Sequence, residues 1–174
     1  EILDPWRGLH LIRDPRDIIV SGCFYHQISD EVWLNKPKPR FQGKTYKEKI
    51  CSFRTIEDKL LFEMEHVGRN TINDMLKWDY NQKNFLEIKY EDLVQDHNLK
   101  IFNQIFLFLG FPENRIDSFL SIAYKHSIFS GKIKTDKHIN SGEPNQWKSY
   151  FTPKLHSRFQ ELFPDSLTSL GYKS

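Results

Sequence analysis

Cysteine is scarce in this sequence, and neither sign of charge dominates. The two cysteines, Cys23 and Cys51, lie far apart and belong to no Cys-x-x-Cys pair or Cys/His array, so we expect no metal site and a reduced, cytoplasmic protein. The 25 Lys and Arg residues nearly balance the 23 Asp and Glu residues and leave a formal net charge of +2. This balance gives no indication of a nucleic-acid partner.

Long hydrophobic runs are also missing. The longest apolar stretch, at 101–111, is much shorter than the roughly 20 residues that cross a bilayer, and no signal-peptide pattern opens the sequence. We therefore expect no membrane span. With 39% hydrophobic and 28% charged residues over a length of 174, the composition is typical of one folded domain and not of a disordered or fibrous chain.

Two short segments have the pattern of β-strands. The apolar run "GLHLIR" at 8–13 ends at Asp14, because the residue before a proline avoids the helical conformation. The segment "NFLEIKYEDL" at 84–93 alternates apolar with charged side chains, as a strand with unlike faces does. We expect both segments to be strands, with Tyr90 on the second.

Helical spacing fills most of the remaining chain. Asp14 suits an N-cap and Pro15 the first turn, which predicts a helix over 15–29. The other expected helices cover 55–78 (as one helix or two successive helices), 97–109, 113–125 and 151–163, and the expected loops cover 34–45 and 130–146. Strands separated by long helical stretches indicate an α/β fold with a parallel sheet, and two strands alone make that sheet incomplete.

The corner between the first strand and the first helix has the residues of a phosphate site. Arg13 stands where the strand ends, which is the edge at which open parallel sheets bind ligands. A phosphate beside the first two helical turns could be reached by the guanidinium of Arg13 and the hydroxyl of Ser21. A purely structural alternative stays open, in which Arg13 pairs with Asp17 and Ser21 fills a tight contact between helix and sheet.

This corner resembles the 3'-phosphate-binding segment of the cytosolic-type sulfotransferases, which use 3'-phosphoadenylyl sulfate (PAPS). In that family a strand ends in Arg, and the following helix carries Ser eight positions later, often followed by Tyr and His. "LIRDPRDIIVSGCFYH" has the same pattern, with Arg13, Ser21, Tyr25 and His26.

Three later segments resemble the same family in the same order. "LEIKYEDL" is similar to the strand whose tyrosine approaches the adenine, which maps to Tyr90, and "YKHSIFSGK" to the segment around the adenine ring, which maps to Ser127 and Phe129. "NSGEPNQWKSYFT" is similar to the late loop that closes over the cofactor, which maps to Ser141 and Gly142.

The last match is partial, and single residues have ordinary structural readings. Where the family has Arg-Lys-Gly, this chain has Asn140, Ser141 and Gly142, and Asn145 replaces a second glycine. An aromatic residue on a strand, such as Tyr90, is often half-buried for packing alone, and Phe129 could belong to the core. Lone histidines such as His26 and His126 are more often structural than catalytic. It is the four matches in one order that favour the resemblance.

The resemblance implies a P-loop-like three-layer αβα fold with a parallel sheet, here truncated and helix-rich. It implies transfer of a sulfuryl group from PAPS to a hydroxyl or amine of a small-molecule or carbohydrate acceptor, with adenosine 3',5'-bisphosphate (PAP) as the product. The family's phosphosulfate loop and its histidine base precede the corner, so residues 1–174 would be the C-terminal portion of one domain, with no catalytic residue and no turnover alone.

Two further expectations stay open at this level. The alternative function is a non-catalytic nucleotide-binding or partner-binding module derived from the same fold. A homo-oligomer is possible, although the family's late dimerisation motif is matched here only by Lys148 and Thr152.

Overall fold

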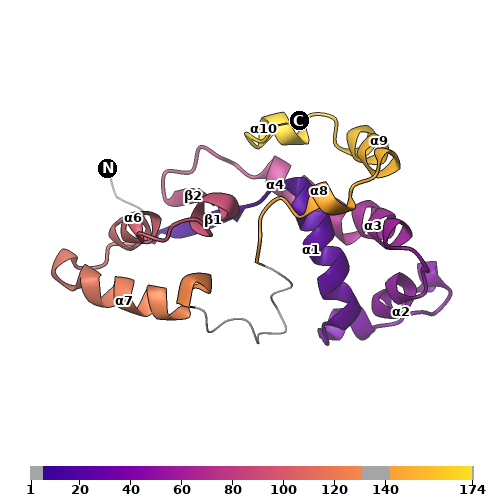
Figure 1. The fold of residues 1–174 in the computed structure, drawn as a ribbon, viewed down its shortest axis with the longest axis horizontal. Coiled ribbons are helices and arrows are strands. Elements are labelled where there is room, and N and C mark those ends of the chain that lie inside the picture. The colour runs from indigo at the N-terminus through magenta and orange to yellow at the C-terminus, as the bar shows by residue number, and fades with distance from the viewer. Residues whose placement is uncertain (1–5, 131–141, 174) are drawn as a thin grey trace. The chain divides into compact units, whose positions relative to one another are not determined.

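The computed structural model of the protein describes residues 6–130 and 142–173. The chain forms two compact units. The first unit comprises residues 1–13 and 79–144, and the second comprises residues 14–78 and 145–174. Each unit is therefore built from two stretches that are distant in sequence, as the colours of Figure 1 show.

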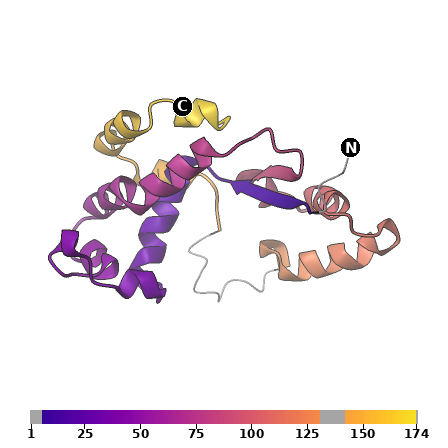
Figure 2. The same ribbon diagram turned by 180° about the vertical axis from the view of Figure 1, so that it is seen from behind.

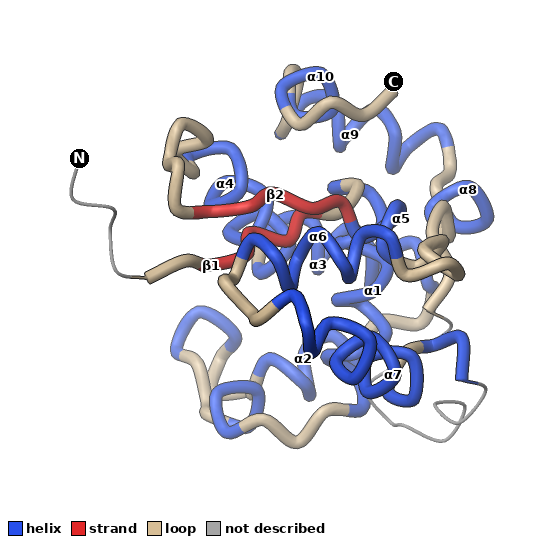
Figure 3. The backbone as a smooth tube through the Cα atoms, turned by 90° about the vertical axis from the view of Figure 1, so that its left-hand side faces the viewer, coloured by secondary structure: helices blue, strands red, loops and turns tan. Residues whose placement is uncertain are grey.

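The first unit contains a two-stranded parallel sheet. β1 (Gly8–Ile12) pairs with β2 (Phe85–Lys89) in a register that sets Gly8 beside Phe85 and Ile12 beside Lys89. Figure 3 shows the two strands side by side. A side chain at Gly8 would clash, because its Cβ would lie 2.6 Å from the Phe85 ring. The parallel pairing that the sequence predicted is confirmed, and the sheet has two strands in the described part of the chain.

The helices of the first unit follow β2. They are α5 (Tyr90–Leu93), α6 (Lys100–Phe108), η3 (Glu113–Arg115), α7 (Ile116–His126) and η4 (Ile128–Ser130) (Figure 2). The carboxylate of Asp96 accepts the backbone N–H groups of Ile101 and Phe102, so α6 begins three residues later than the spacing predicted. α6 packs on α7 through the rings of Phe106 and Phe119, whose centroids lie 5.7 Å apart.

In the described residues the second unit is helical and has no strand. Its elements are α1 (Pro15–Ile28), η1 (Val32–Asn35), η2 (Pro39–Phe41), α2 (Tyr46–Cys51), α3 (Ile56–Glu65), α4 (Val67–Lys77), α8 (Trp147–Tyr150), α9 (Pro153–Leu162) and α10 (Ser166–Ser169). Asp14 caps α1 as predicted, and Thr152 caps α9, since each side chain accepts a backbone N–H of the first turn. The stretch predicted as one helix or two is two, divided at His66.

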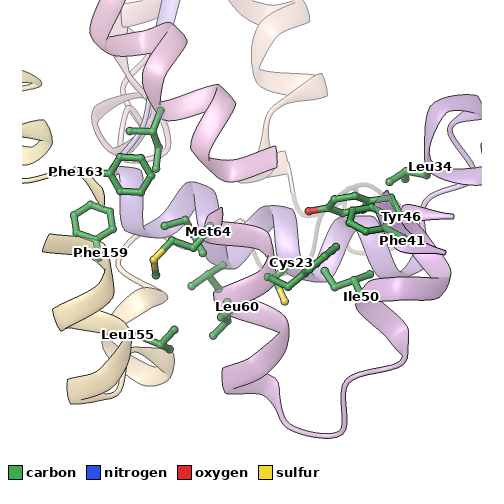
Figure 4. Packing of buried hydrophobic residues seen from close by; sticks show 14 of the residues in the cluster. Cys23, Leu34, Phe41, Tyr46, Ile50, Leu60, Met64, Leu155, Phe159 and Phe163 are labelled. Carbon is green, nitrogen blue, oxygen red and sulfur yellow. The ribbon is translucent and has the colours of Figure 1, made fainter. Parts of the chain in front are cut away.

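The main hydrophobic core belongs to the second unit, with α1 at its centre. Ile19, Val20 and Cys23, at helical spacing on α1, are fully buried against α2, α3 and α4. α9 adds Leu155 and Phe159 over α3, and Phe41 and Tyr46 lie together on the other side of the cluster (Figure 4). The predicted 34–45 loop contains the end of η1 and all of η2, and it contributes Leu34 and Phe41 to this core.

No helix in residues 6–130 and 142–173 is long and apolar enough to cross a membrane. The same residues contain no cluster of three or more His, Cys, Asp or Glu side chains that could hold a metal ion.

Candidate functional site

Arg16, in the first turn of α1, has a structural role. Arg16 donates from Nε and Nη2 to the Asp14 carboxylate at 3.0 and 2.8 Å. Its Nη2 also donates to the Lys173 carbonyl at 2.8 Å, and its guanidinium lies 3.7 Å from the centroid of the Trp147 ring. Arg16 is 5% exposed. It therefore braces the second unit.

Arg13 lies at the carboxyl edge of the sheet, in the first unit. The register pairs Ile12 with Lys89, so Arg13 and Tyr90 are the first residues after two adjacent parallel strands. The Arg13 guanidinium lies 4.3 Å from the centroid of the Tyr90 ring, a distance at which cation and ring attract. The edge at which parallel sheets bind ligands thus carries a stacked pair of cation and aromatic ring.

The segment at Gly142 joins this pair. Tyr90 Oη donates to the Gly142 carbonyl at 2.9 Å, and Arg13 Nη2 donates to the Glu143 carbonyl at 3.2 Å. Gly142 has a φ of 72°, the left-handed region that favours glycine. Three residues expected at one cofactor site, Arg13, Tyr90 and Gly142, are therefore brought together within one unit.

Tyr90 is not on the alternating strand, which corrects the prediction for 84–93. β2 ends at Lys89, and Tyr90 begins the short helix α5. The acidic pair Glu91 and Asp92 in the first turn of α5 favours a helix N-terminus there. The change of direction takes Tyr90 out of the pleat, so its ring reaches the guanidinium of Arg13.

Ser127 and Phe129 form a second group in the same unit, at the end of α7. Ser127 Oγ donates to the Tyr124 carbonyl at 2.8 Å and accepts from the Phe129 N–H at 3.2 Å. The Phe129 ring packs against the His97 ring, with centroids 4.5 Å apart and ring planes tilted by 50°. The described hydrogen bonds of Ser127 are thus local to the end of α7.

The other two predicted residues are placed differently. Ser21 lies on α1 in the second unit and is half-buried. Ser141 lies outside the described residues.

A buried aspartate that the sequence did not reveal as important orders the loop that leads into α8. Asp17 is completely buried on α1, and its Oδ2 and Oδ1 accept the backbone N–H groups of Asn145 and Trp147 at 2.6 and 2.9 Å. Asn145 has a φ of 63°, in the left-handed region. Asn145 stands where the family has its second glycine, and asparagine tolerates this conformation better than most residues. Asparagine is therefore compatible with the backbone conformation that this position has here.

A second buried polar group was also missed by sequence reasoning. His26, Tyr46 and Glu63 come from α1, α2 and α3, and their side chains meet in the core of the second unit. Burial, followed by the charge of Glu63, raises the pKa of Cys23 to about 12, and the same two causes raise that of Tyr46 far above its usual range. The only signal in the sequence was the placement of Glu63 inside the apolar run "LLFEM".

Comparison with known proteins identifies the family. The model of the sulfotransferase domain matches residues 4–171, almost the entire chain. The chain belongs to the sulfotransferase family. Mouse sulfotransferase 2A2 is 29% identical over 181 residues, and human sulfotransferase 2A1 is 29% identical over 176 residues.

This sulfotransferase chain spans little more than half of those relatives. The alignments cover 92% and 93% of the chain but 56% of each relative. The crystal structure of mouse sulfotransferase SULT7A1 complexed with PAP has a TM-score of 0.61 at 21% identity, covering 93% of the chain and 58% of the solved one. The predicted α/β fold, truncated and helix-rich, is confirmed by this similarity and by the small parallel sheet.

Proposed function

We propose that this chain carries the 3'-phosphate and adenine side of a PAPS site, and that the reaction it serves is sulfuryl transfer to a hydroxyl or amine acceptor. The observation that carries the proposal is the stack of Arg13 on Tyr90 at the carboxyl ends of two parallel strands. A guanidinium offers a planar fork of donors that matches phosphate oxygens. The pair stands at the edge where such sheets bind nucleotides.

The donors present fit a nucleotide bisphosphate. Arg13 would hold a phosphate. Tyr90 would keep the Arg13 side chain in place, because its ring lies against the guanidinium and its hydroxyl donates a hydrogen bond to the Gly142 carbonyl. Ser127, Phe129 and Ser141 would border the adenine, as the resemblance implies. The resemblance also names Ser21, which lies in the second unit. PAPS, when bound, supplies the activated sulfuryl group, and the residues of this chain bind and orient its nucleotide part.

The loop from Gly142 to Trp147 supports the same assignment. Gly142 and Asn145 both have left-handed backbones, and Asp17 holds the N–H groups of Asn145 and Trp147. A loop tied down in this way can present further backbone donors to a phosphate without the cost of ordering them on binding. We expect no turnover by these 174 residues alone, because the resemblance places the phosphosulfate loop before Arg13.

Titration calorimetry with PAP at low salt tests the proposal. Each hydrogen bond to a charged group contributes about 1.5 to 3 kcal/mol, so Arg13→Ala should weaken binding at least roughly tenfold. Arg13→Lys keeps the charge but loses the fork, and its affinity should lie between the two. Tyr90→Phe loses the bond to Gly142 and should weaken binding less than Arg13→Ala.

A matched control is available in the same unit. Arg7 resembles Arg13 in its contacts, because each guanidinium donates to a backbone carbonyl and lies over an aromatic ring. For Arg7 the carbonyl and the ring both belong to Phe108. Arg7→Ala should leave PAP binding unchanged. Equal losses in the Arg7 and Arg13 variants, or no heat of binding in the parent protein, would refute the assignment.

A further inference from the structure

One stretch of the second unit carries a marked excess of positive charge. Residues 36–44, with the sequence "KPKPRFQGK", contain four basic residues and no acidic one. We refer to these nine residues as the basic loop. The wider stretch 36–54 contains seven basic residues and a single acidic one, Glu48, although the 25 basic and 23 acidic residues of the whole chain nearly balance. Positive charge is therefore concentrated at a segment to which the proposed function assigns no role.

The backbone of the basic loop forms a closed turn. The Lys38 N–H donates to the Lys44 carbonyl at 3.0 Å, and the Gly43 N–H donates to the Lys38 carbonyl at 3.2 Å. Phe41, inside the turn, is 7% exposed and belongs to the core of the second unit. The loop is thus anchored from within. Its charged side chains can meet a ligand without the entropy cost of ordering a flexible segment.

The basic side chains of this loop are accessible. Lys36, Arg40 and Lys44 are exposed, and Lys38 is half-buried. None of the four forms an ion pair with a carboxylate in the described part of the chain. A Cβ at Gly43 would meet nothing within 4 Å beyond its chain neighbours, so the tip of the loop stands in open space. The loop therefore presents a cationic surface to solvent.

Exposed aliphatic side chains lie beside the basic loop. Ile28, the last residue of α1, is 60% exposed, and Val32, the first residue of η1, is 73% exposed. Lys47 Nζ donates to the Ile28 carbonyl at 3.4 Å, which sets the first turn of α2 against the end of α1. Ile28 is therefore a neighbour of the helix that directly follows the basic loop.

η1 and η2 are neighbours because they share one buried side chain. The rings of Trp33 and Phe41 lie 5.5 and 6.1 Å from the ring of Tyr46, between centroids. Val32 and Arg40 directly precede these two aromatic residues, and both are exposed. The aliphatic and the cationic side chains thus occupy neighbouring parts of the surface of the second unit.

The two acidic residues next to Val32 have partners of their own. Asp30 pairs with Lys47, whose Nζ lies 2.9 Å from Oδ1. The carboxylate of Glu31 accepts from Tyr25 Oη at 2.6 Å and from Trp33 Nε1. These contacts hold both carboxylates to the protein, so they weaken the attraction of the basic loop for an anion less than free carboxylates would.

This combination of side chains fits a lipid surface better than other polyanions. Anionic headgroups attract Lys and Arg, and exposed aliphatic side chains are stabilised at the boundary of the acyl chains. Single-stranded nucleic acid is bound through accessible aromatic rings, whereas Trp33 is half-buried and Phe41 and Tyr46 are buried. We propose that the basic loop binds the surface of a membrane containing anionic lipids, with Ile28 and Val32 in contact with the lipid. This binding does not depend on the proposed function.

Vesicle flotation with the whole chain tests the proposal. Vesicles of three parts phosphatidylcholine to one part phosphatidylserine should bind the protein, and vesicles of phosphatidylcholine alone should bind it far more weakly. Added salt should weaken the binding, because it screens the attraction between exposed charges and headgroups. Equal binding to both kinds of vesicle, or binding to neither, would overturn the proposal.

Charge variants locate the surface that binds. A basic residue near an anionic membrane contributes a factor of about five to the affinity, so Arg40→Gln with Lys44→Gln should weaken binding roughly 25-fold. Arg40→Lys with Lys44→Arg keeps both charges and should bind like the parent. The matched control is Arg69→Gln with Lys77→Gln, which removes two exposed charges from α4 of the same unit and should leave binding unchanged. Equal losses in the two neutral double variants would show a response to net charge alone and refute the assignment.

An apolar variant distinguishes lipid from a soluble polyanion. Val32→Thr replaces one exposed methyl group by a hydroxyl at constant shape, and it should weaken vesicle binding by at least about fourfold, the contribution of one buried carbon. Ile122→Thr, at another exposed site on α7, is the control and should have no effect. Tighter binding to heparin or to single-stranded DNA than to the vesicles, with Val32→Thr like the parent, would overturn the assignment to lipid.

Discussion

Asp17 should control the loop that leads into α8, and its replacement gives a sharp test of how the second unit is held together. The side chain is completely buried, and its two oxygens accept the N–H groups of Asn145 and Trp147 at 2.6 and 2.9 Å. The two partners lie 128 and 130 residues away in sequence. Together with Arg16, which donates to the Lys173 carbonyl, Asp17 ties α1 to the C-terminal stretch of the second unit.

The expected magnitudes follow from the charge and the number of acceptors. A hydrogen bond to an ionised group is worth about 1.5 to 3 kcal/mol, and a buried donor left without an acceptor costs about 1 to 3 kcal/mol. Asp17→Asn keeps one oxygen and loses the charge, so the free energy of unfolding should fall by about 2 kcal/mol. Asp17→Ala leaves both N–H groups without this acceptor and should cost about 3 to 5 kcal/mol.

Amide hydrogen exchange measures the effect where it arises. Protection of the Asn145 and Trp147 amides should drop in Asp17→Asn, and denaturant unfolding should report the global loss. Asp74→Asn is the matched control, because Asp74 is exposed on α4 in the same unit and should change stability by no more than about 0.5 kcal/mol. Unchanged protection of both amides in Asp17→Asn, with stability equal to that of the control, would refute this account of the loop.

Two further outcomes follow from shifted pKa values. Burial and then the charge of Glu63 raise the pKa of Cys23 to about 12, so iodoacetamide at mildly alkaline pH should label exposed Cys51 and leave Cys23 unmodified until the protein unfolds. Equal labelling rates of the two cysteines in a mass-spectrometric time course would contradict this. Hydrogen bonds from Thr152 and then Lys154 hold the pKa of Glu57 below its usual value of 4.5. A lowered folded-state pKa stabilises the fold above the unfolded-state pKa, and this stabilisation is lost as the pH falls through the folded-state value. The stability difference between the parent and Glu57→Gln should therefore be present at neutral pH and shrink below about pH 4.5, whereas a difference independent of pH would be incompatible with this role.

Local rules in the sequence determined where most elements begin. Asp14-Pro15 and Thr152-Pro153 start helices because the cap and the proline act within one turn, whatever the rest of the chain does. The helix α2 was missed although its signal is local. Thr45 and Glu48 form a reciprocal capping box. The pattern Thr-x-x-Glu begins at the last residue of the predicted 34–45 loop, and no element was predicted for the residues between that loop and the helix expected from 55.

The sequence also determined the parallel pairing and the position of Arg13. A strand, a long helical crossover and a second strand leave the parallel arrangement as the expected one, and a proline two residues after Arg13 fixes the end of the first strand. The family followed from the same motif, since Arg13 and Ser21 stand at a fixed spacing along one continuous segment.

Only the tertiary structure decided what the buried polar residues do. Asp17 and Asn145 are 128 residues apart, and Glu63 is 37 residues from His26, so no local pattern links the members of either group. Asp17 accepts two remote N–H groups and Glu63 accepts from two remote side chains because folding removes water from them, and a buried polar group must then find a partner within the protein. Which partner it finds depends on the packing of α1 against α2, α3 and α8, and that packing is a property of the whole second unit.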